Sequence, residues 1–130
     1  MKKPVAGKGR ILVVEDEPGI TRVCLRTLVP RGYEVEVAND GSIAEGMLGG
    51  AAYDLMLVDI RTPVMNGIQL YEYITDNHPE MMKRVIFTTG DVISGDTQYF
   101  LEKSGQPVLA KPFTPEELIG IVNEALERLC

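Results

Sequence analysis

The sequence has few of the residues on which several common functions depend. Its 130 residues include two cysteines, one histidine and no tryptophan. Cys24 and Cys130 lie far apart and lack metal-ligand spacing, which favours reduced thiols over a disulfide framework. The basic N-terminus leads only to the short apolar run Ile11–Val14, so it is no signal peptide, and no segment is long enough to span a membrane. These absences predict a cytoplasmic protein without membrane insertion.

Positive charge is scarce after the N-terminus. Residues 1–10 contain four of the 13 basic residues and no acid, which leaves 9 basic against 19 acidic groups in residues 11–130, a net charge of −10. Direct nucleic-acid binding needs a clustered basic face, so this balance argues against it. We expect residues 1–10 to be a flexible basic lead-in and residues 11–130 to form a single domain.

Strand-like and helix-like patterns alternate along the domain. Apolar residues at helical spacing follow the first strand-like run, from Ile20 to Leu28, and end the chain, from Leu118 to Leu129. Alternation of this kind predicts an α/β fold, a doubly wound five-stranded parallel sheet with five helices. The predicted strands are Ile11–Val14, Glu34–Ala38, Asp54–Asp59, Arg84–Thr88 and Val108–Ala110.

Helix starts are signalled by "NDG", "MNG" and "TPEE", the last of which is a capping box from Thr114 to Glu117 with proline at the first helical position. The second helix should be short, from Ser42 to about Leu48, because Gly46 lies inside it and two glycines follow. Tyr99 and Phe100 on the fourth helix are expected to be half-buried core residues.

Acidic residues follow two of the predicted strands. Glu15 and Asp16 come after the first strand, and Asp59 ends the third. The carboxyl ends of parallel strands share one sheet edge, so these carboxylates should meet there and suit Mg²⁺. We expect Asp16 and Asp59 to bind the metal directly and Glu15 to bind through water. Glu17 should face the solvent.

A hydroxyl and a cation are predicted at the same edge. Thr88 and Thr89 end the fourth strand, and Lys111 follows the fifth. A lysine and a threonine hydroxyl can bind a phosphoryl group. Asp59 is then the candidate nucleophile, since a carboxylate can form an aspartyl-phosphate.

The motifs "VVEDEP", "LVDIRTPVMNG", "IFTTGD" and "LAKPF" together resemble the receiver domain of two-component response regulators, the CheY-like superfamily, from about Ile11 to Leu129. The resemblance implies strand order 2-1-3-4-5 and a phosphoryl group passed to Asp59 by a histidine kinase or phosphotransfer domain. It implies Thr89 and Lys111 as phosphoryl-binding catalytic residues. The implied Mg²⁺ ligands are Glu15, Asp16, Asp59 and the backbone carbonyl of Arg61.

The resemblance also implies an output and some variation. Phosphorylation would switch a surface that binds a downstream protein, in a monomer or weak dimer, with self-phosphorylation from small phosphodonors and slow dephosphorylation as activities. Arg61 and Thr62 depart from the common residues, and Val108 stands where the family often has an aromatic. The stretches "TTGD" and "SGQPVLAKPF" resemble receivers of hybrid histidine kinases. Because no output domain follows the last predicted helix in this sequence, we expect either a stand-alone regulator or a receiver cut from a hybrid kinase or a longer regulator.

Three other functions fit these residues less well than the phosphoacceptor. A pseudo-receiver would bind partners without phosphorylation, but no residue of the predicted phosphoryl site is missing. A hydrolase of the haloacid dehalogenase type needs an aspartate two residues after the nucleophile, where this chain has Arg61. A flavodoxin-like flavin binder would have its phosphate repelled by the acids at 15–17.

Overall fold

The computed structural model describes residues 8–90 and 94–129. All sheet neighbours pair in parallel, in the order β2-β1-β3-β4-β5, which confirms the predicted fold class and strand order. The strands are β1 (Gly9–Val14), β2 (Tyr33–Ala38), β3 (Leu55–Asp59), β4 (Val85–Thr89) and β5 (Val108–Ala110). The helices are α1 (Pro18–Leu28), α2 (Gly41–Gly50), α3 (Gly67–Asn77), α4 (Gly95–Ser104) and α5 (Pro115–Arg128), with 3-10 turns η1 (Val29–Arg31) and η2 (Pro79–Arg84).

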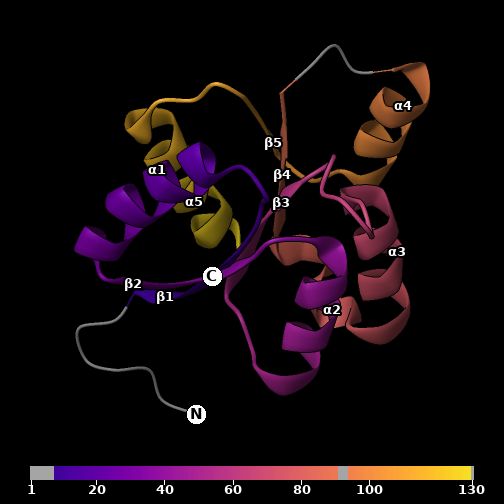
Figure 1. The fold of residues 1–130 in the computed structure, drawn as a ribbon, viewed down its shortest axis with the longest axis horizontal. Coiled ribbons are helices and arrows are strands. Elements are labelled where there is room, and N and C mark those ends of the chain that lie inside the picture. Colours follow the sequence, from indigo (N-terminus) through magenta and orange to yellow (C-terminus); the bar gives the residue numbers. More distant parts are fainter. Residues whose placement is uncertain (1–7, 91–93, 130) are drawn as a thin grey trace.

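The helices cover the two faces of the sheet as separate layers. Figure 1 shows α1 and α5 on one side and α2, α3 and α4 on the other. Side chains alternate along each strand, so Ile11 and Val13 pack toward α1 and α5 while Leu12 and Val14 pack toward α2 and α3. The sheet is therefore buried on both faces, as its nearly continuous apolar strands require.

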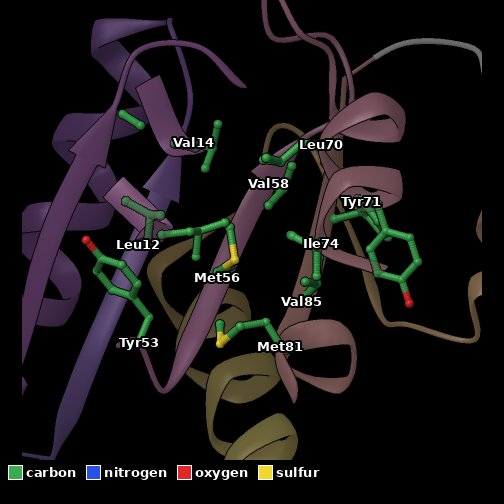
Figure 2. Packing of buried hydrophobic residues seen from close by; sticks show 14 of the residues in the cluster. Leu12, Val14, Tyr53, Met56, Val58, Leu70, Tyr71, Ile74, Met81 and Val85 are labelled. Atoms are coloured by element: carbon green, nitrogen blue, oxygen red, sulfur yellow. The ribbon is translucent and has the colours of Figure 1, made fainter. Parts of the chain in front are cut away.

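The larger core lies under α2, α3 and α4. Figure 2 shows Met56 and Val58 of β3 facing Leu70 and Ile74 of α3. Full burial of an aliphatic side chain of this kind stabilises a fold by about 1.5–3 kcal/mol. This layer fixes α3 against β3 and so fixes the loop that follows Asp59.

Three aromatic rings join strand and helices within this layer. Tyr71 of α3, Phe87 of β4 and Phe100 of α4 pack edge to face, with ring centroids 5.4–5.7 Å apart. Phe100 is half-buried, as predicted, whereas Tyr99 is 63% exposed and the prediction of a core position for it was wrong. Neighbouring residues of a helix point about 100° apart, so only one of the two rings can face the core.

The second helix is longer than its glycines suggested. It continues to Gly50 instead of ending near Leu48, although among the described residues it is still, with α4, the shortest α-helix. Ala44 and Leu48 are buried in the core, and Asp40 caps the first turn by accepting a hydrogen bond from the Ile43 amide at 2.8 Å. Packing of one apolar face outweighs the cost of glycine in the helix.

Other local signals are confirmed. Thr114 and Glu117 form the predicted capping box at the start of α5, and Asn66 with Gln69 forms another at the start of α3 that was not foreseen. Strand limits differ from the predictions by no more than two residues. Gly9 and Arg10 of the expected lead-in belong to β1, and residues 1–7 lie outside the described part.

The thiol of Cys24 is buried and free, and burial raises its pKa to about 12, so it stays protonated at neutral pH. The absence of a disulfide framework stays a prediction. Cys130 lies outside the described residues.

Candidate functional site

The candidate site lies at the carboxyl edge of the sheet, where β1, β3, β4 and β5 end. The register pairs Asp59 with Thr88, and Thr89 with Ala110. The Lys111 amide donates a hydrogen bond to the Thr89 carbonyl at 2.8 Å, which extends the ladder by one residue. The backbone therefore brings residues separated by about fifty positions to one edge, as the sequence predicted.

Lys111 lies among three acids. Its Nζ atom is 2.8 Å from Glu15 Oε1, 2.9 Å from Glu17 Oε1 and 3.2 Å from Asp59 Oδ2. Glu15 and Asp59 are buried, and only the Glu17 carboxylate is largely exposed. The expectation that Glu17 simply faces the solvent was therefore wrong. The run of three acids in "EDE" was the only sequence signal for this contact.

The electrostatics of this group follow from burial and from the imbalance of charge. Burial raises the pKa of the Glu15 carboxyl above its ordinary value, Lys111 opposes that rise, and the charge of Asp59 adds to it. Burial alone would lower the pKa of Lys111, but its contacts with Glu15 and Glu17 and the charge of Asp59 raise it. Lys111 is consequently a fixed cation at neutral pH.

One carboxylate oxygen of the site is buried with a lysine ammonium as its polar neighbour. Glu15 Oε1 lies 2.8 Å from Lys111 Nζ, and no other group in the described residues donates a hydrogen bond to it. Carboxylate oxygens of Glu15, Glu17 and Asp59 lie within 4.8 Å of one another. A buried acceptor within a cluster of hard oxygen ligands fits a divalent cation such as Mg²⁺.

The other predicted ligands lie beside this cluster. Asp16 is exposed, and its carboxylate is not one of the three around Lys111. Arg61 is exposed at the start of the loop after β3, and its amide donates a hydrogen bond to Asp59 Oδ1 at 3.2 Å. Asp59 is thus held by the backbone on one side and by Lys111 on the other.

An open pocket leads from the solvent to Asp59. Its lining includes Glu17, Arg61, Gly90 and Lys111. Pro112 of the "LAKPF" motif also lines the pocket, together with Ile20, which the sequence did not single out as part of a site. The pocket gives a reactant access to a carboxylate that is otherwise 4% exposed.

The two threonines of β4 have different surroundings. Thr88 is 1% exposed, whereas Thr89 is half-buried at the strand end beside Gly90 of the pocket. Alternation along the strand turns the two side chains to opposite faces of the sheet. This difference supports the choice of Thr89 over Thr88.

The loop between β3 and α3 is tightly built. The buried Thr62 hydroxyl donates to the Met65 carbonyl at 3.0 Å, and the Met65 amide donates to the Pro63 carbonyl at 2.7 Å. The second bond closes a γ-turn around Val64, which has φ 67° and is 82% exposed. Positive φ is strained for a β-branched residue.

The α3 end of this loop leaves no room for a side chain at Gly67. A Cβ atom there would lie 2.8 Å from the Asp59 carbonyl oxygen and 2.8 Å from Ile60 Cα. The Gly67 amide also donates to the Ile60 carbonyl at 3.0 Å. Close backbone contact therefore fixes the strand end that carries Asp59.

A doubly wound sheet that gathers acids and a lysine around an aspartate lining an open pocket, with a threonine at the end of the neighbouring strand, is the arrangement expected of a phosphoacceptor domain. Comparison with known proteins agrees, because the model of the response regulator receiver domain matches residues 11–123. The chain belongs to this family and is a receiver domain of two-component signalling.

Individual relatives show the same likeness. The chain is 32% identical to the transcriptional regulatory protein PcoR of Escherichia coli and 33% identical to the DNA-binding response regulator MtrA of Mycolicibacterium smegmatis, each over 92% of this chain. It spans 52% of the first and 51% of the second, about half of their length.

Solved structures extend the likeness to the fold. A CheY-like receiver domain protein from Methanospirillum hungatei is 30% identical with a TM-score of 0.82, covering 92% of this chain and 94% of that one. The receiver domain of Francisella response regulator 1452 is 27% identical with a TM-score of 0.81, covering 95% and 100%. None of the helices in the described ranges has both the length and the apolar character of a membrane span. The hybrid-kinase context stays a prediction.

Proposed function

We propose that this domain accepts a phosphoryl group on Asp59 from the phosphohistidine of a histidine kinase or phosphotransfer domain, in a reaction that depends on Mg²⁺. The observation that carries the proposal is the position of Asp59, a buried carboxylate at the base of an open pocket with a lysine ammonium 3.2 Å away. A second, phosphorylation-independent role as a pseudo-receiver is the outcome if no transfer occurs.

The chemistry is a displacement at phosphorus. A carboxylate oxygen of Asp59 attacks, a P–O bond forms, the P–N bond to the donor histidine breaks, and its electron pair stays with the imidazole nitrogen. The Arg61 amide and Lys111 hold the two oxygens of Asp59 in a fixed orientation before the reaction. Such positioning lowers the entropic part of the barrier.

Negative charge accumulates in the pocket during transfer. The site already holds three acids against one lysine, so a phosphoryl anion entering it would be repelled. Glu15, Asp16, Asp59 and the Arg61 carbonyl would hold the metal, whose bound charge neutralises the phosphoryl oxygens. Lys111 and the Thr89 hydroxyl would donate hydrogen bonds to the transferred group.

The phosphorylated state would change the surface offered to a partner. A phosphoryl group adds about two negative charges and new hydrogen-bond acceptors at the ends of β3, β4 and β5. Thr89 ends the strand whose Phe87 ring packs against α3 and α4. A shift of Thr89 toward the phosphoryl group would therefore be felt at α4, where a downstream protein could read it.

Intact-protein mass after incubation with acetyl phosphate tests the proposal. We expect a gain of one phosphoryl group with Mg²⁺ and none after chelation. Asp59→Asn should abolish the gain, whereas Asp76→Asn on the exposed surface of α3 should leave it unchanged. Both variants lose one charge, so the comparison isolates the position of the carboxylate.

Two outcomes would contradict the proposal. An adduct that persists in Asp59→Asn would place the acceptor elsewhere. No adduct on the parent chain, with Mg²⁺ binding shown by calorimetry and no transfer from a phosphorylated histidine donor, would favour the pseudo-receiver.

A further inference from the structure

Glu17 occupies an unusual position in the acid cluster. It is the residue just before α1, with its side chain 60% exposed, and it reaches Lys111 across 94 positions of the sequence. Glu15 and Asp59, the other two acids around Lys111, are both buried. The contact between Glu17 and Lys111 can therefore break and re-form without leaving a buried carboxylate unpaired.

The Lys111 ammonium has one carboxylate acceptor for each of its N–H donors. Its Nζ atom lies 2.8 Å from Glu15 Oε1, 2.9 Å from Glu17 Oε1 and 3.2 Å from Asp59 Oδ2. An ammonium has three N–H donors, and three carboxylates lie within 3.2 Å of this one. No N–H donor of Lys111 is therefore left for a further acceptor.

A phosphoryl group on Asp59 would need Lys111 as a donor, so one of these contacts must be given up. Glu15 is buried and would be left with an uncompensated charge, which is costly. An exposed ion pair contributes little and separates easily. The contact with Glu17 is therefore the one that a phosphoryl group replaces.

We propose that Glu17 is a positioning residue that holds Lys111 among the acids and thereby competes with the phosphoryl group for its ammonium. The proposal rests on the proposed function and adds a residue that sets how strongly the phosphorylated state is favoured. Removing the Glu17 carboxylate should release Lys111 and strengthen the binding of a phosphoryl group or its analogue.

The first test measures the release of Lys111 without any phosphoryl chemistry. Metal-free protein is labelled with a limiting dose of acetic anhydride, and the extent of labelling at Lys111 relative to exposed Lys83 is read by peptide mass spectrometry. Glu17→Gln should raise this ratio by about twofold to fivefold, the factor that a partly exposed ion pair contributes. Glu17→Ala should raise it further, because an amide oxygen can still accept a hydrogen bond.

The matched control is Asp16→Asn. It removes the same charge from the adjacent residue, whose carboxylate is not among the three around Lys111. A smaller rise in the labelling ratio in Asp16→Asn than in Glu17→Gln supports the contact between Glu17 and Lys111. Equal labelling in the two variants would overturn the inference, because it would reduce the role of Glu17 to general charge.

The second test measures binding of beryllium trifluoride, an aspartyl-phosphate analogue, by calorimetry at a Mg²⁺ concentration that saturates each variant. Glu17→Gln should lower the dissociation constant about twofold to fivefold. Glu124→Gln, on the exposed surface of α5, should match the parent chain.

The outcomes separate this inference from the proposed function. Binding by the parent chain with no tightening in the Glu17 variants would overturn the inference alone. No binding by the parent chain, together with no phosphoryl adduct, would overturn both.

Discussion

Charged side chains are paired differently at the two ends of the parallel sheet. At the amino end, Arg10 pairs with Glu34 at 3.3 Å, and the Arg10 amide donates to the Asp54 carboxylate at 2.8 Å. Arg84 donates to the Asp54 carbonyl at 3.0 Å. Arg10 also lies 4.0 Å from Glu36, and both glutamates are partly exposed. Backbone groups complete the contacts at this end.

At the carboxyl end, one lysine serves three acids. Two of these acids are buried, so their mutual repulsion is weakly screened. Where only stability is required, as at the amino end, the fold gives its charged groups ion-pair or hydrogen-bond partners. The excess of negative charge at the carboxyl end instead allows that end to bind a cation.

Removing the cation should have the largest effect on this contrast. Lys111→Met leaves Glu15 and Asp59 buried without a counter-charge, and we expect the free energy of unfolding to fall by about 3 kcal/mol in metal-free protein. Mg²⁺ should restore part of the loss, because it binds only the folded acids. Urea unfolding with and without Mg²⁺ measures this.

Lys83→Met is the control, since it removes an exposed lysine from η2 and should change stability by less than about 0.5 kcal/mol. If both variants lost the same free energy of unfolding, repulsion between the acids at the carboxyl end would not be a cost that Lys111 offsets.

The next effect in size is expected from the close backbone packing beside Asp59, where Gly67 has no room for a side chain. Gly67→Ala should lower stability by about 1–3 kcal/mol, because its Cβ would overlap Asp59 and Ile60. Gly46→Ala on α2 has no atom within 4 Å of the new Cβ, and should gain about 0.5–1 kcal/mol from helix propensity. Urea unfolding of both variants decides this, and a gain in Gly67→Ala would contradict the packing.

At the amino end, Tyr53 offers a smaller effect with a pH signature. Its hydroxyl donates to Glu36 at 2.6 Å, so Tyr53→Phe should cost about 1 kcal/mol at neutral pH. Burial, with the hydrogen bond and charge of Glu36, raises the pKa of Tyr53 to about 12 from an ordinary value of 10.0. The unfolded chain therefore loses this proton first as pH rises, and the parent chain loses stability above about pH 10.

Tyr53→Phe should lose stability less steeply over the same range. Urea unfolding at a series of pH values from neutral to about pH 11 tests this. Parallel curves for the two proteins would show that Tyr53 does not contribute to the alkaline decline.

The smallest effect is expected at Val64, where the carboxyl end holds backbone strain. Val64→Asn should raise stability by about 0.5–1 kcal/mol, because asparagine tolerates positive φ. Val64→Thr keeps the β-branch and should give no gain. Thermal unfolding of the two variants gives the answer, and equal midpoints would remove strain as the explanation.

Much of the fold was predictable because its signals are local or follow from chain topology. Apolar runs, helical spacing and the cap at Thr114 lie within short windows of sequence, and parallel crossovers have one hand. The length of α2 was not predictable in this way. It depends on burial of Ala44 and Leu48 against other elements, which no window contains.

The site was predictable where strand ends determine it. Asp59 and Lys111 could be expected at the same edge, since each ends or follows a parallel strand of the same sheet. The contact of Glu17 with Lys111 depends on the first turn of α1 and on a flexible side chain. That contact could only be found from the three-dimensional structure.

The ring cluster of Tyr71, Phe87 and Phe100 also makes the domain suitable for optical study. The chain has no tryptophan, so Phe100→Trp would introduce a single indole beside the strand that ends in Thr89. Its emission would follow the environment between β4 and α4 without interference from another indole. A shift of the emission wavelength after a phosphodonor is added would then report the rate at which the environment of α4 changes.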